Sequence, residues 1–431
     1  MKISSLKKQL AILLCFLPLS GFLFASSINT TNSVNTTSLV KFLKSKEDIR
    51  FQGEFDTSYI QIKKHKTKSD KKLHVNYNSL YTRFQKKNSN YELRISPIFT
   101  LYRTNSGEEL YNNNLSKTCD KNKFFFKELF LRKYYGDHSF GFGLLPFSNN
   151  SFIEYQDDYK KRGEGLSILV DAVMPNFFYT YKINNRMKFK TGFGKYSWLD
   201  FLPKGDFIYE GNDETNIYWA VLDYSSEQIK SYSNFIYGDA KYFGKDVADV
   251  AVFGSGLVYD DSSRSGFSIY NTVGFSYYKN NNTHLKNEIL KNNNIPFGTE
   301  LLYPNNFAFD NKTYTGWSNQ LGVRQDFDFK NKEFFINYEW FHTEGDWFSF
   351  NNGTPYRGNC NTMFNIRDDS HMFAVGAIPN ENWIIKLFYV NAEFNEVSKV
   401  GLPPVTLPSE MALGNRKKEM EYTRFQIKYK F

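Results

Sequence analysis

A strict two-residue alternation of polar and apolar side chains is the feature that most constrains this chain. It is clearest at the C-terminal end, where residues 423–431 read TRFQIKYKF. Successive side chains of a β-strand point to opposite faces, so this strand has one apolar, aromatic face and one polar, cationic face. The apolar face carries Phe425, Ile427, Tyr429 and Phe431, and the polar face carries Arg424, Gln426, Lys428 and Lys430. One face requires lipid or a protein core, and the other requires water.

The same alternation recurs along most of the chain. The sequence predicts strands over residues 50–59, 72–81, 91–103, 124–135, 139–146, 177–183, 187–196, 217–225, 229–238, 247–259, 266–278, 317–329, 333–343, 371–378, 383–394 and 423–431. A strand of about ten residues is long enough to cross a membrane at the tilt of a β-barrel. Helical periodicity is nearly absent, with a modest candidate at 284–290 and at most a short turn near 39–43. We therefore expect an all-β protein.

The connections between these strands alternate between short turns and long polar stretches. The long stretches are residues 104–122, 147–163, 197–215, 280–316, 344–368 and 395–418. Outer-membrane β-barrels have this asymmetry, with short periplasmic turns and long external loops, and their strand number is even. Residues 165–173 are either loop or part of one irregular strand with 177–183 that is interrupted at Pro175. We predict a transmembrane antiparallel β-barrel of sixteen strands, with eighteen as the alternative.

Two segments resemble known outer-membrane proteins. The C-terminal strand resembles the closing strand of bacterial outer-membrane β-barrels, which implies that Phe425, Ile427, Tyr429 and Phe431 form a signal for the barrel insertion machinery. The Trp-Phe-rich stretch 339–350, followed by Tyr356-Arg357-Gly358 and the strand 383–394, resembles a family of uncharacterised bacterial outer-membrane porins. This second resemblance covers roughly the last hundred residues. It implies a porin-like barrel surrounded by outer-membrane lipids, and it also implies the homotrimer that is common among sixteen-stranded porins.

The N-terminal segment has the pattern of a cleavable signal peptide. Lys2, Lys7 and Lys8 precede an apolar run over residues 10–17, and Pro18 and Ala25 follow it. This order of a cationic start, a short apolar run and a small residue is typical of secretory leaders. We expect residues 1–25 to be the signal peptide, residues 26–48 a periplasmic lead-in, and residues 49–431 a barrel located in the outer membrane.

The overall composition agrees with a barrel. Mean hydropathy is −0.53, and the sequence after the leader contains no apolar run of the roughly twenty residues that a spanning helix needs. These hydropathy criteria do not detect β-barrels, because only alternate residues of a barrel strand contact lipid. Aromatic residues make up 18% of the chain, with 30 Tyr and 43 Phe, as expected if girdles of rings lie at both membrane interfaces. The formal net charge of +9 is too small to indicate nucleic-acid binding.

A barrel of this size predicts a pore. Sixteen strands enclose an aqueous channel unless a domain plugs it, and residues 26–48 are too few for a plug. We therefore expect passive diffusion of small hydrophilic solutes or ions. The charged side chains predicted to line the lumen include Arg50, Glu54, Asp56, Lys72, Arg94, Lys188, Lys190, Arg324, Arg424, Lys428 and Lys430. Together with Glu92, Asp326, Asp328, Glu333 and Glu339, which belong to the same polar faces, the predicted lumen has nine cations and seven carboxylates. Because charges along a pore set its ionic preference, this small excess of cations favours anions slightly.

Other functions find less support in the sequence. The six His residues show no pairing with a Ser nucleophile and an orienting acid, so we do not expect an enzyme. The sequence has no CxxC motif and no His/Cys cluster, so it predicts neither a metal site nor a cofactor. Cys119 and Cys360 could pair or remain two thiols. The alternative function is an outer-membrane binding or adhesion protein that acts through its long external loops.

Overall fold

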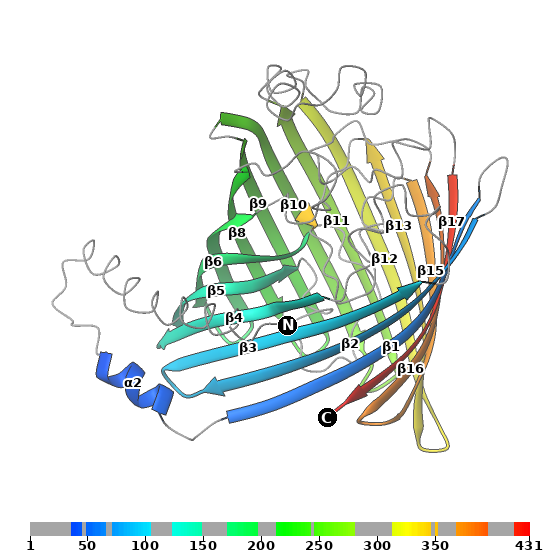
Figure 1. Ribbon diagram of the computed structural model, residues 1–431, viewed down its shortest axis with the longest axis horizontal. Coiled ribbons are helices and arrows are strands. Elements are labelled where there is room, and N and C mark those ends of the chain that lie inside the picture. Colours follow the sequence, from blue (N-terminus) through cyan, green and yellow to red (C-terminus); the bar gives the residue numbers. More distant parts are fainter. Residues whose placement is uncertain are drawn as a thin grey trace.

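The computed structural model of the chain is a closed antiparallel β-barrel of sixteen strands (Figure 1). The structure describes residues 36–44, 49–65, 71–104, 123–148, 170–196, 213–242, 245–280, 313–345, 350–351, 368–394 and 418–431. Each strand of the wall pairs with the strands before and after it in the chain, and the pairing of β1 with β17 closes the barrel. The predicted fold class is therefore confirmed.

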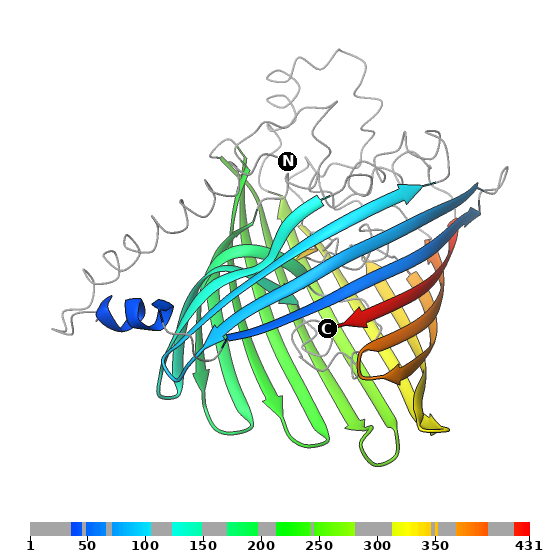
Figure 2. The same cartoon turned by 60° about the horizontal axis from the view of Figure 1, so that its bottom comes forward.

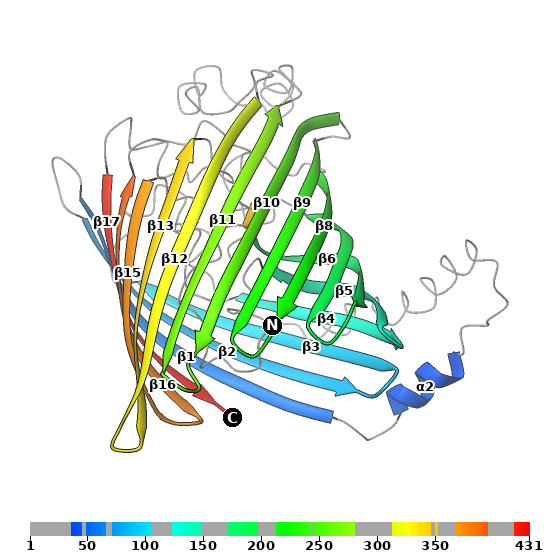
Figure 3. The same cartoon turned by 180° about the vertical axis from the view of Figure 1, so that it is seen from behind.

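The strands of the wall follow one another in chain order. They are β1 (Ile49–His65), β2 (Lys71–Lys87), β3 (Tyr91–Thr104), β4 (Lys123–Tyr135), β5 (His138–Ser148), β6 (Val170–Lys182), β7 (Met187–Tyr196), β8 (Asp213–Ser225), β9 (Ile229–Tyr242), β10 (Lys245–Asp261), β11 (Phe267–Asn280), β12 (Thr313–Phe329), β13 (Lys332–Gly345), β15 (Asp368–Asn380), β16 (Trp383–Phe394) and β17 (Lys418–Lys430). The view from behind shows β8–β13 as one continuous curved wall (Figure 3).

Two local expectations need adjustment. The segment around Pro175 forms a single strand, β6, which continues through the proline, and this supports sixteen strands over eighteen. The lead-in contains a helix, α2 (Thr36–Lys44), that is longer than the turn expected there. The helical candidate at 284–290 lies outside the described residues. Among the described helices, none has both the length and the apolar content needed to cross a bilayer.

The two ends of the barrel differ in their connections. One end, the turn end, has the short hairpin connections 88–90, 136–137, 183–186, 226–228, 262–266, 330–331 and 381–382, together with the start of β1 and the end of β17. Figure 2 shows these hairpins side by side. The opposite end, the loop end, has the long connections 105–122, 149–169, 197–212, 281–312, 346–367 and 395–417, and the shorter connections 66–70 and 243–244; of these, only residues 350–351 belong to the described part of the chain. All the long connections predicted from the sequence therefore lie at one end, although two connections at that end are short.

The two faces of the wall also differ. Large apolar side chains point outward and remain exposed on strands around the whole barrel; examples are Phe55, Leu101, Phe193, Phe253, Phe275, Ile336, Phe373 and Phe425. Inward-facing side chains are mostly buried against one another and include many polar groups; examples are Asp56, Ser79, Glu92, Glu128, Asn234, Thr272, Gln320 and Arg424. This arrangement is typical of a barrel that meets lipid outside and water inside.

Inside the wall, aromatic rings lie over glycines on the adjacent strand. The pairs are Phe178 over Gly141, Trp219 over Gly192, Tyr232 over Gly256, Tyr270 over Gly322 and Phe335 over Gly376, each directly opposite in register. They occupy the successive strand pairs β5–β6, β7–β8, β9–β10, β11–β12 and β13–β15. A Cβ added to Gly322 would lie 2.0 Å from Cζ of Tyr270, so the ring occupies the space of the missing side chain. This arrangement lets large rings lie flat along the wall.

Gly322→Val is expected to destabilise the barrel by about 1–3 kcal/mol, because Tyr270 must leave its position or the strands must separate. The measurement is the temperature at which heat-modifiable migration on a gel is lost. Since the two residues share one space, the double variant Gly322→Val/Tyr270→Ala should recover part of the loss. Additive effects of the two substitutions would contradict this packing account.

A short additional strand connects opposite sides of the barrel. β14 (Phe350–Asn351) follows β13 in the chain but pairs in parallel with Val170–Asp171, at the loop end of β6. The pairing of β6 with β7 begins only at Asn176 and Gly194, so this edge of β6 is not used by β7. Six strands separate β6 from β13 on the shorter path around the wall. The chain after β13 therefore reaches the far side of the barrel before it returns to β15.

Candidate functional site: the charged wall of the lumen

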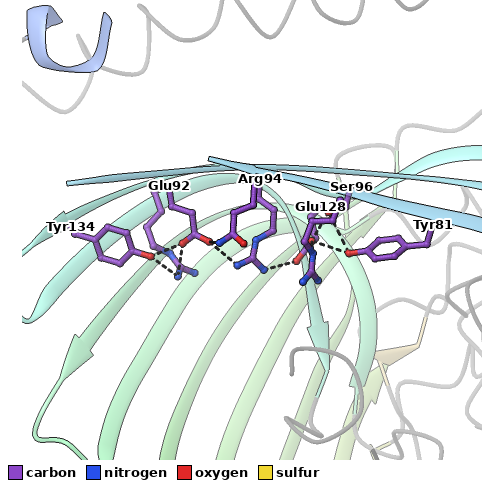
Figure 4. Close-up of polar contacts among 9 residues, drawn as sticks. Tyr81, Glu92, Arg94, Ser96, Glu128 and Tyr134 are labelled. Atoms are coloured by element: carbon purple, nitrogen blue, oxygen red, sulfur yellow. Dashed lines mark hydrogen bonds and ion pairs between the residues drawn. The ribbon is translucent and has the colours of Figure 1, made fainter. Parts of the chain in front are cut away.

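Among the residues that the structure describes, the most connected group of charged side chains lies on the inner face of β2, β3 and β4 (Figure 4). Glu128 of β4 is at its centre and is 1% exposed. Its carboxylate accepts hydrogen bonds from Arg83 Nε at 3.1 Å, Arg94 Nη1 at 3.0 Å and Ser96 Oγ at 2.5 Å. Two guanidinium groups therefore converge on one buried carboxylate.

The network continues toward the turn end through Glu92, which is also 1% exposed. Arg94 Nη2 donates to Glu92 Oε1 at 2.6 Å, and the hydroxyl of Tyr134 donates to Glu92 Oε2 at 2.5 Å. Arg132 Nη1 lies 3.4 Å from the same oxygen. Arg94 thus bridges the two carboxylates, and the charges alternate in sign along the wall. We call Arg83, Glu92, Arg94, Glu128 and Arg132 the ionic ladder.

The strands place these residues by their two-residue period and by one bulge. Glu92, Arg94 and Ser96 alternate along β3 and therefore share its inner face. The register between β3 and β4 shifts after Ser96, where Pro97 cannot donate a backbone hydrogen bond. This irregularity lies beside Glu128, which pairs with Ser96. Bulges change the direction of side chains in this way near functional positions.

Aromatic rings support the arginines of the ladder. The guanidinium carbon of Arg94 lies 5.2 Å from the centre of the Phe130 ring, and that of Arg132 lies 4.9 Å from the centre of Phe178. Guanidinium groups stack favourably on aromatic faces. The same Phe178 covers Gly141, so the glycine–aromatic packing of the wall holds one end of the ladder in place.

A second charged group joins the first and last strands. Arg424 of β17 donates to Ser58 Oγ from Nε at 3.0 Å, and its Nη2 lies 3.3 Å from Asp56 Oδ2. Gln426 Nε2 donates to Asp56 at 2.5 Å, and Lys428 Nζ donates to Glu54 Oε1 at 3.0 Å. We call this group the seam network, because β1 and β17 are the strands that close the barrel.

The remaining wall carries smaller polar groups. Gln320 and Asn337 donate to the two oxygens of Glu339 at 3.0 and 2.8 Å. Arg324 Nε donates to Asp326 at 2.7 Å, and the Arg324 guanidinium lies 4.0 Å from the centre of the Phe335 ring. These groups lie on β12 and β13.

The structure places ten of the residues predicted to line the lumen on the inner face. Glu54, Asp56, Arg94, Arg324, Arg424 and Lys428 belong to the networks described above. Lys190 forms an ion pair with Asp223 across β7 and β8. The others follow from register, since Arg50 lies opposite Gln85, Lys188 opposite Asp223 and Lys430 opposite Glu54. The predicted insertion residues Phe425, Ile427, Tyr429 and Phe431 form the outward face of the closing strand.

The faces of β2 are the reverse of the expected ones. Lys72 was expected in the lumen, which by the two-residue period would place Tyr81 against lipid, but Tyr81 and Arg83 point inward and Leu80 points outward. By the two-residue period Lys72 belongs to the outward set; its side chain lies outside the described part. The error arose because Tyr81 packs on Ile98 inside the wall and donates to Ser96 and Glu128. When aromatic residues also line the lumen, an alternating apolar pattern does not show which face of the strand points to lipid.

Sequence reasoning did not single out Arg83, Glu128, Arg132 or Tyr134. Arg83 was missed with the reversed face of β2. In β4 the run Phe124-Phe125-Phe126 hides the alternation, and the bulge shifts it. The spacing of Glu128, Arg132 and Tyr134 at even positions was the signal that could have identified them.

Charge is unevenly distributed around the lumen. The described inward side chains of β16, β17 and β1–β4 include nine cations, Arg50, Arg83, Lys87, Arg94, Arg132, Lys386, Arg424, Lys428 and Lys430, and four carboxylates, Glu54, Asp56, Glu92 and Glu128. Those of β5–β13 include five cations, Lys182, Lys188, Lys190, Lys230 and Arg324, and six carboxylates, Asp223, Asp260, Asp326, Asp328, Glu333 and Glu339. One side of the described wall is therefore clearly cationic, and the other is close to neutral.

Comparison with known proteins agrees with this architecture. No protein family model matches the chain, and no curated protein matches it by sequence. Among solved structures, the anion-selective porin from Comamonas acidovorans aligns with a TM-score of 0.51 at 9% identity, covering 89% of this chain and 99% of that porin. OmpF of Salmonella typhi, in complex with daunomycin, aligns with a TM-score of 0.49 at 11% identity, covering 89% and 97%. OmpT, an outer membrane protein of Vibrio cholerae, aligns with a TM-score of 0.46 at 10% identity, covering 89% and 97%. The chain therefore has a porin-like fold.

Proposed function

We propose that this chain is an outer-membrane porin, a passive diffusion channel for small hydrophilic solutes or ions with a preference for anions. The observation that carries the proposal is the contrast between the two faces of a closed sixteen-stranded wall, which is apolar outside and charged inside. A barrel of this strand number encloses an aqueous channel when side chains alone cannot fill it. The similar porin from Comamonas acidovorans is anion-selective, which agrees with the proposed preference.

The preference for anions follows from the uneven charge of the lumen. On β16, β17 and β1–β4, cations outnumber carboxylates by more than two to one among the described inward side chains. The ionic ladder itself contains three arginines and two glutamates. Fixed charges along a narrow aqueous path raise the local concentration of counter-ions. A solute between the two sides would experience a field directed across the pore.

Purified protein in planar bilayers tests both parts of the proposal. We expect stable conductance steps and, under a potassium chloride gradient, a reversal potential whose sign corresponds to chloride carrying more current than potassium. The preference should weaken as salt rises, because the Debye length falls from about 10 Å at 0.1 M to about 3 Å at 1 M. A barrel that folds but remains electrically silent would favour the binding or adhesion alternative, and a cation-selective reversal potential would contradict the charge argument.

The proposal also includes export, membrane insertion and assembly, and the first two of these depend on the two ends of the sequence. Residues 1–25 would direct export and be removed, and residues 26–48 would remain in the periplasm before the barrel domain at 49–431. The outward aromatic face of β17, with Phe425, Tyr429 and Phe431, would be read by the barrel insertion machinery. Assembly into a homotrimer within outer-membrane lipids is part of the same proposal. The proposal assigns no catalytic activity to the chain.

A further inference from the structure

The helix α2 packs against the outside of the barrel and not inside it. In Figures 1 and 3 it lies beside the ends of β1, β2 and β3. Phe42 is its anchor, with 3% of its surface exposed, and its ring centre lies 5.5 Å from that of Tyr91. Lys86 Nζ lies 5.3 Å from the centre of the Phe42 ring and donates a hydrogen bond to the carbonyl oxygen of Leu43 at 3.0 Å.

These contacts place the helix on the outer face of the wall. Tyr91 and Leu93 alternate with Glu92 and Arg94, which point into the lumen, so they point outward. Lys86 lies opposite Leu93 in register and shares its face. The amine of Lys86 reaches a carbonyl in the last turn of the helix, where a cation also interacts favourably with the helix dipole. The helix is thus fixed at the turn end on the surface that we propose faces lipid.

The helix has two faces of different character. At 100° per residue, Leu39, Val40 and Leu43 fall on one side of the helix, and Lys41 falls on the opposite side. Val40 is 47% exposed and Leu43 40% exposed, although both are apolar. Phe42 lies at the edge of the apolar side and packs on the barrel, so the rest of that side projects away from the protein.

We propose that α2 is an interfacial helix that inserts Val40 and Leu43 into the lipid leaflet at the turn end of the barrel. This inference rests on the proposed membrane location. The adjacent outward side chains Ile49 and Phe51 are 47% and 62% exposed, so the apolar side of the helix continues the apolar outer surface of β1. Lys41 on the opposite side is exposed and suits the phosphate groups of a phospholipid surface.

The proposed position has a consequence for the pore. A lead-in held outside the barrel by Phe42 and by lipid leaves the turn end of the lumen free of this helix. It also ties the chain immediately before β1 to the strands β2 and β3, which follow β1 in the wall. The helix would therefore hold the N-terminal strands together from outside the barrel.

Site-directed spin labelling of the full chain in vesicles of phosphatidylethanolamine and phosphatidylglycerol tests this position. Single cysteines at Val40, Leu43 or Lys41 would be labelled in a chain with Cys15→Ser, Cys119→Ser and Cys360→Ser. Oxygen concentrates in lipid, whereas a polar nickel chelate remains in water. The relaxation that each of them causes in a spin label therefore reports how deep that label lies in the membrane. We expect the ratio of oxygen to nickel accessibility to be severalfold higher at Val40→Cys and Leu43→Cys than at Lys41→Cys. Equal ratios dominated by the nickel chelate at all three positions would overturn the inference.

A label at Phe55→Cys separates this inference from the proposed function. Phe55 points outward from β1 and is 43% exposed. A lipid signal at Phe55→Cys with a water signal at Val40→Cys would overturn the helix position alone. A water signal at Phe55→Cys as well would overturn the membrane location and the inference together. Heat-modifiable migration of each labelled variant establishes that the barrel has formed.

Discussion

Deletion of Phe431 is expected to reduce the yield of assembled barrel by about tenfold or more. Phe431 and Gly53 exchange two backbone hydrogen bonds, of 2.9 and 3.0 Å, at the seam between β17 and β1. The ring of Phe431 also fills the space beside Gly53, where an added Cβ would lie 2.1 Å from its Cζ. Phe431 is 49% exposed, so only part of its ring is covered. Two hydrogen bonds of about 1 kcal/mol each and this covered part of the ring amount to about 2–3 kcal/mol, and about 1.4 kcal/mol corresponds to a factor of ten. The measurement is the fraction of heat-modifiable protein in the outer-membrane fraction.

Two further variants distinguish seam packing from recognition by the insertion machinery. Phe431→Tyr keeps both the backbone pairing and the ring and should assemble nearly as well as the parent chain. Gly53→Val leaves the terminal residue in place but displaces its ring. If Gly53→Val assembles normally while the deletion fails, the seam-packing explanation is wrong and the effect belongs to recognition of the closing strand alone.

Glu128→Gln is expected to have the largest effect within the lumen, on both stability and ion selectivity. The substitution removes the charge on which Arg83 and Arg94 converge, and it leaves two guanidinium groups close together within the wall. Removing one partner of a buried ion pair costs about 3–5 kcal/mol. The side chains of Arg83 and Arg94 are 10% and 18% exposed, so we expect the lower end of this range. Thermal loss of heat-modifiable migration measures it.

The same substitution changes the charge balance of the ionic ladder from three cations and two anions to three and one. The reversal potential in a salt gradient should therefore shift further toward anions. Glu227→Gln is a matched control, because Glu227 in the connection 226–228 forms an exposed ion pair with Arg264 in the connection 262–266. The loss of this ion pair should change stability by less than about 1 kcal/mol. In the double variant Glu128→Gln/Arg94→Gln, part of the lost stability should return. An unchanged reversal potential in Glu128→Gln would mean that permeating ions do not approach the ladder.

The strand pattern was readable from the sequence because it depends on local geometry. All sixteen strands expected from the sequence are present. The continuous strand β6 answers the question of whether the residues before Pro175 form a loop or part of a strand. A two-residue period follows from the backbone of a single strand and needs no knowledge of its neighbours. The division into short and long connections is also a property of the sequence alone, and it indicated an even number of strands.

Which face of each strand points to lipid and which to the lumen was harder to predict, because the lumen accepts aromatic residues as well as charges. Tyr81, Phe178, Trp219 and Phe335 point inward, where glycines or small side chains on neighbouring strands make room for them. Alternation alone does not distinguish such a ring from one that faces lipid. This is the physical reason why β2 was assigned the wrong way round while β1 and β17, with their charged inner faces, were assigned correctly.

The sequence by itself determined that this chain forms many two-faced strands and that its terminal strand presents aromatic residues on one side and cations on the other. Only the tertiary structure decided which of those charges meet. Arg424 lies more than 360 positions from Asp56 and Ser58, and Arg83 and Glu128 come from strands that are not adjacent in the wall. Such partners are set by barrel closure, register and the bulge beside Pro97, which depend on pairing between distant segments. A side-chain period contains no information on that pairing.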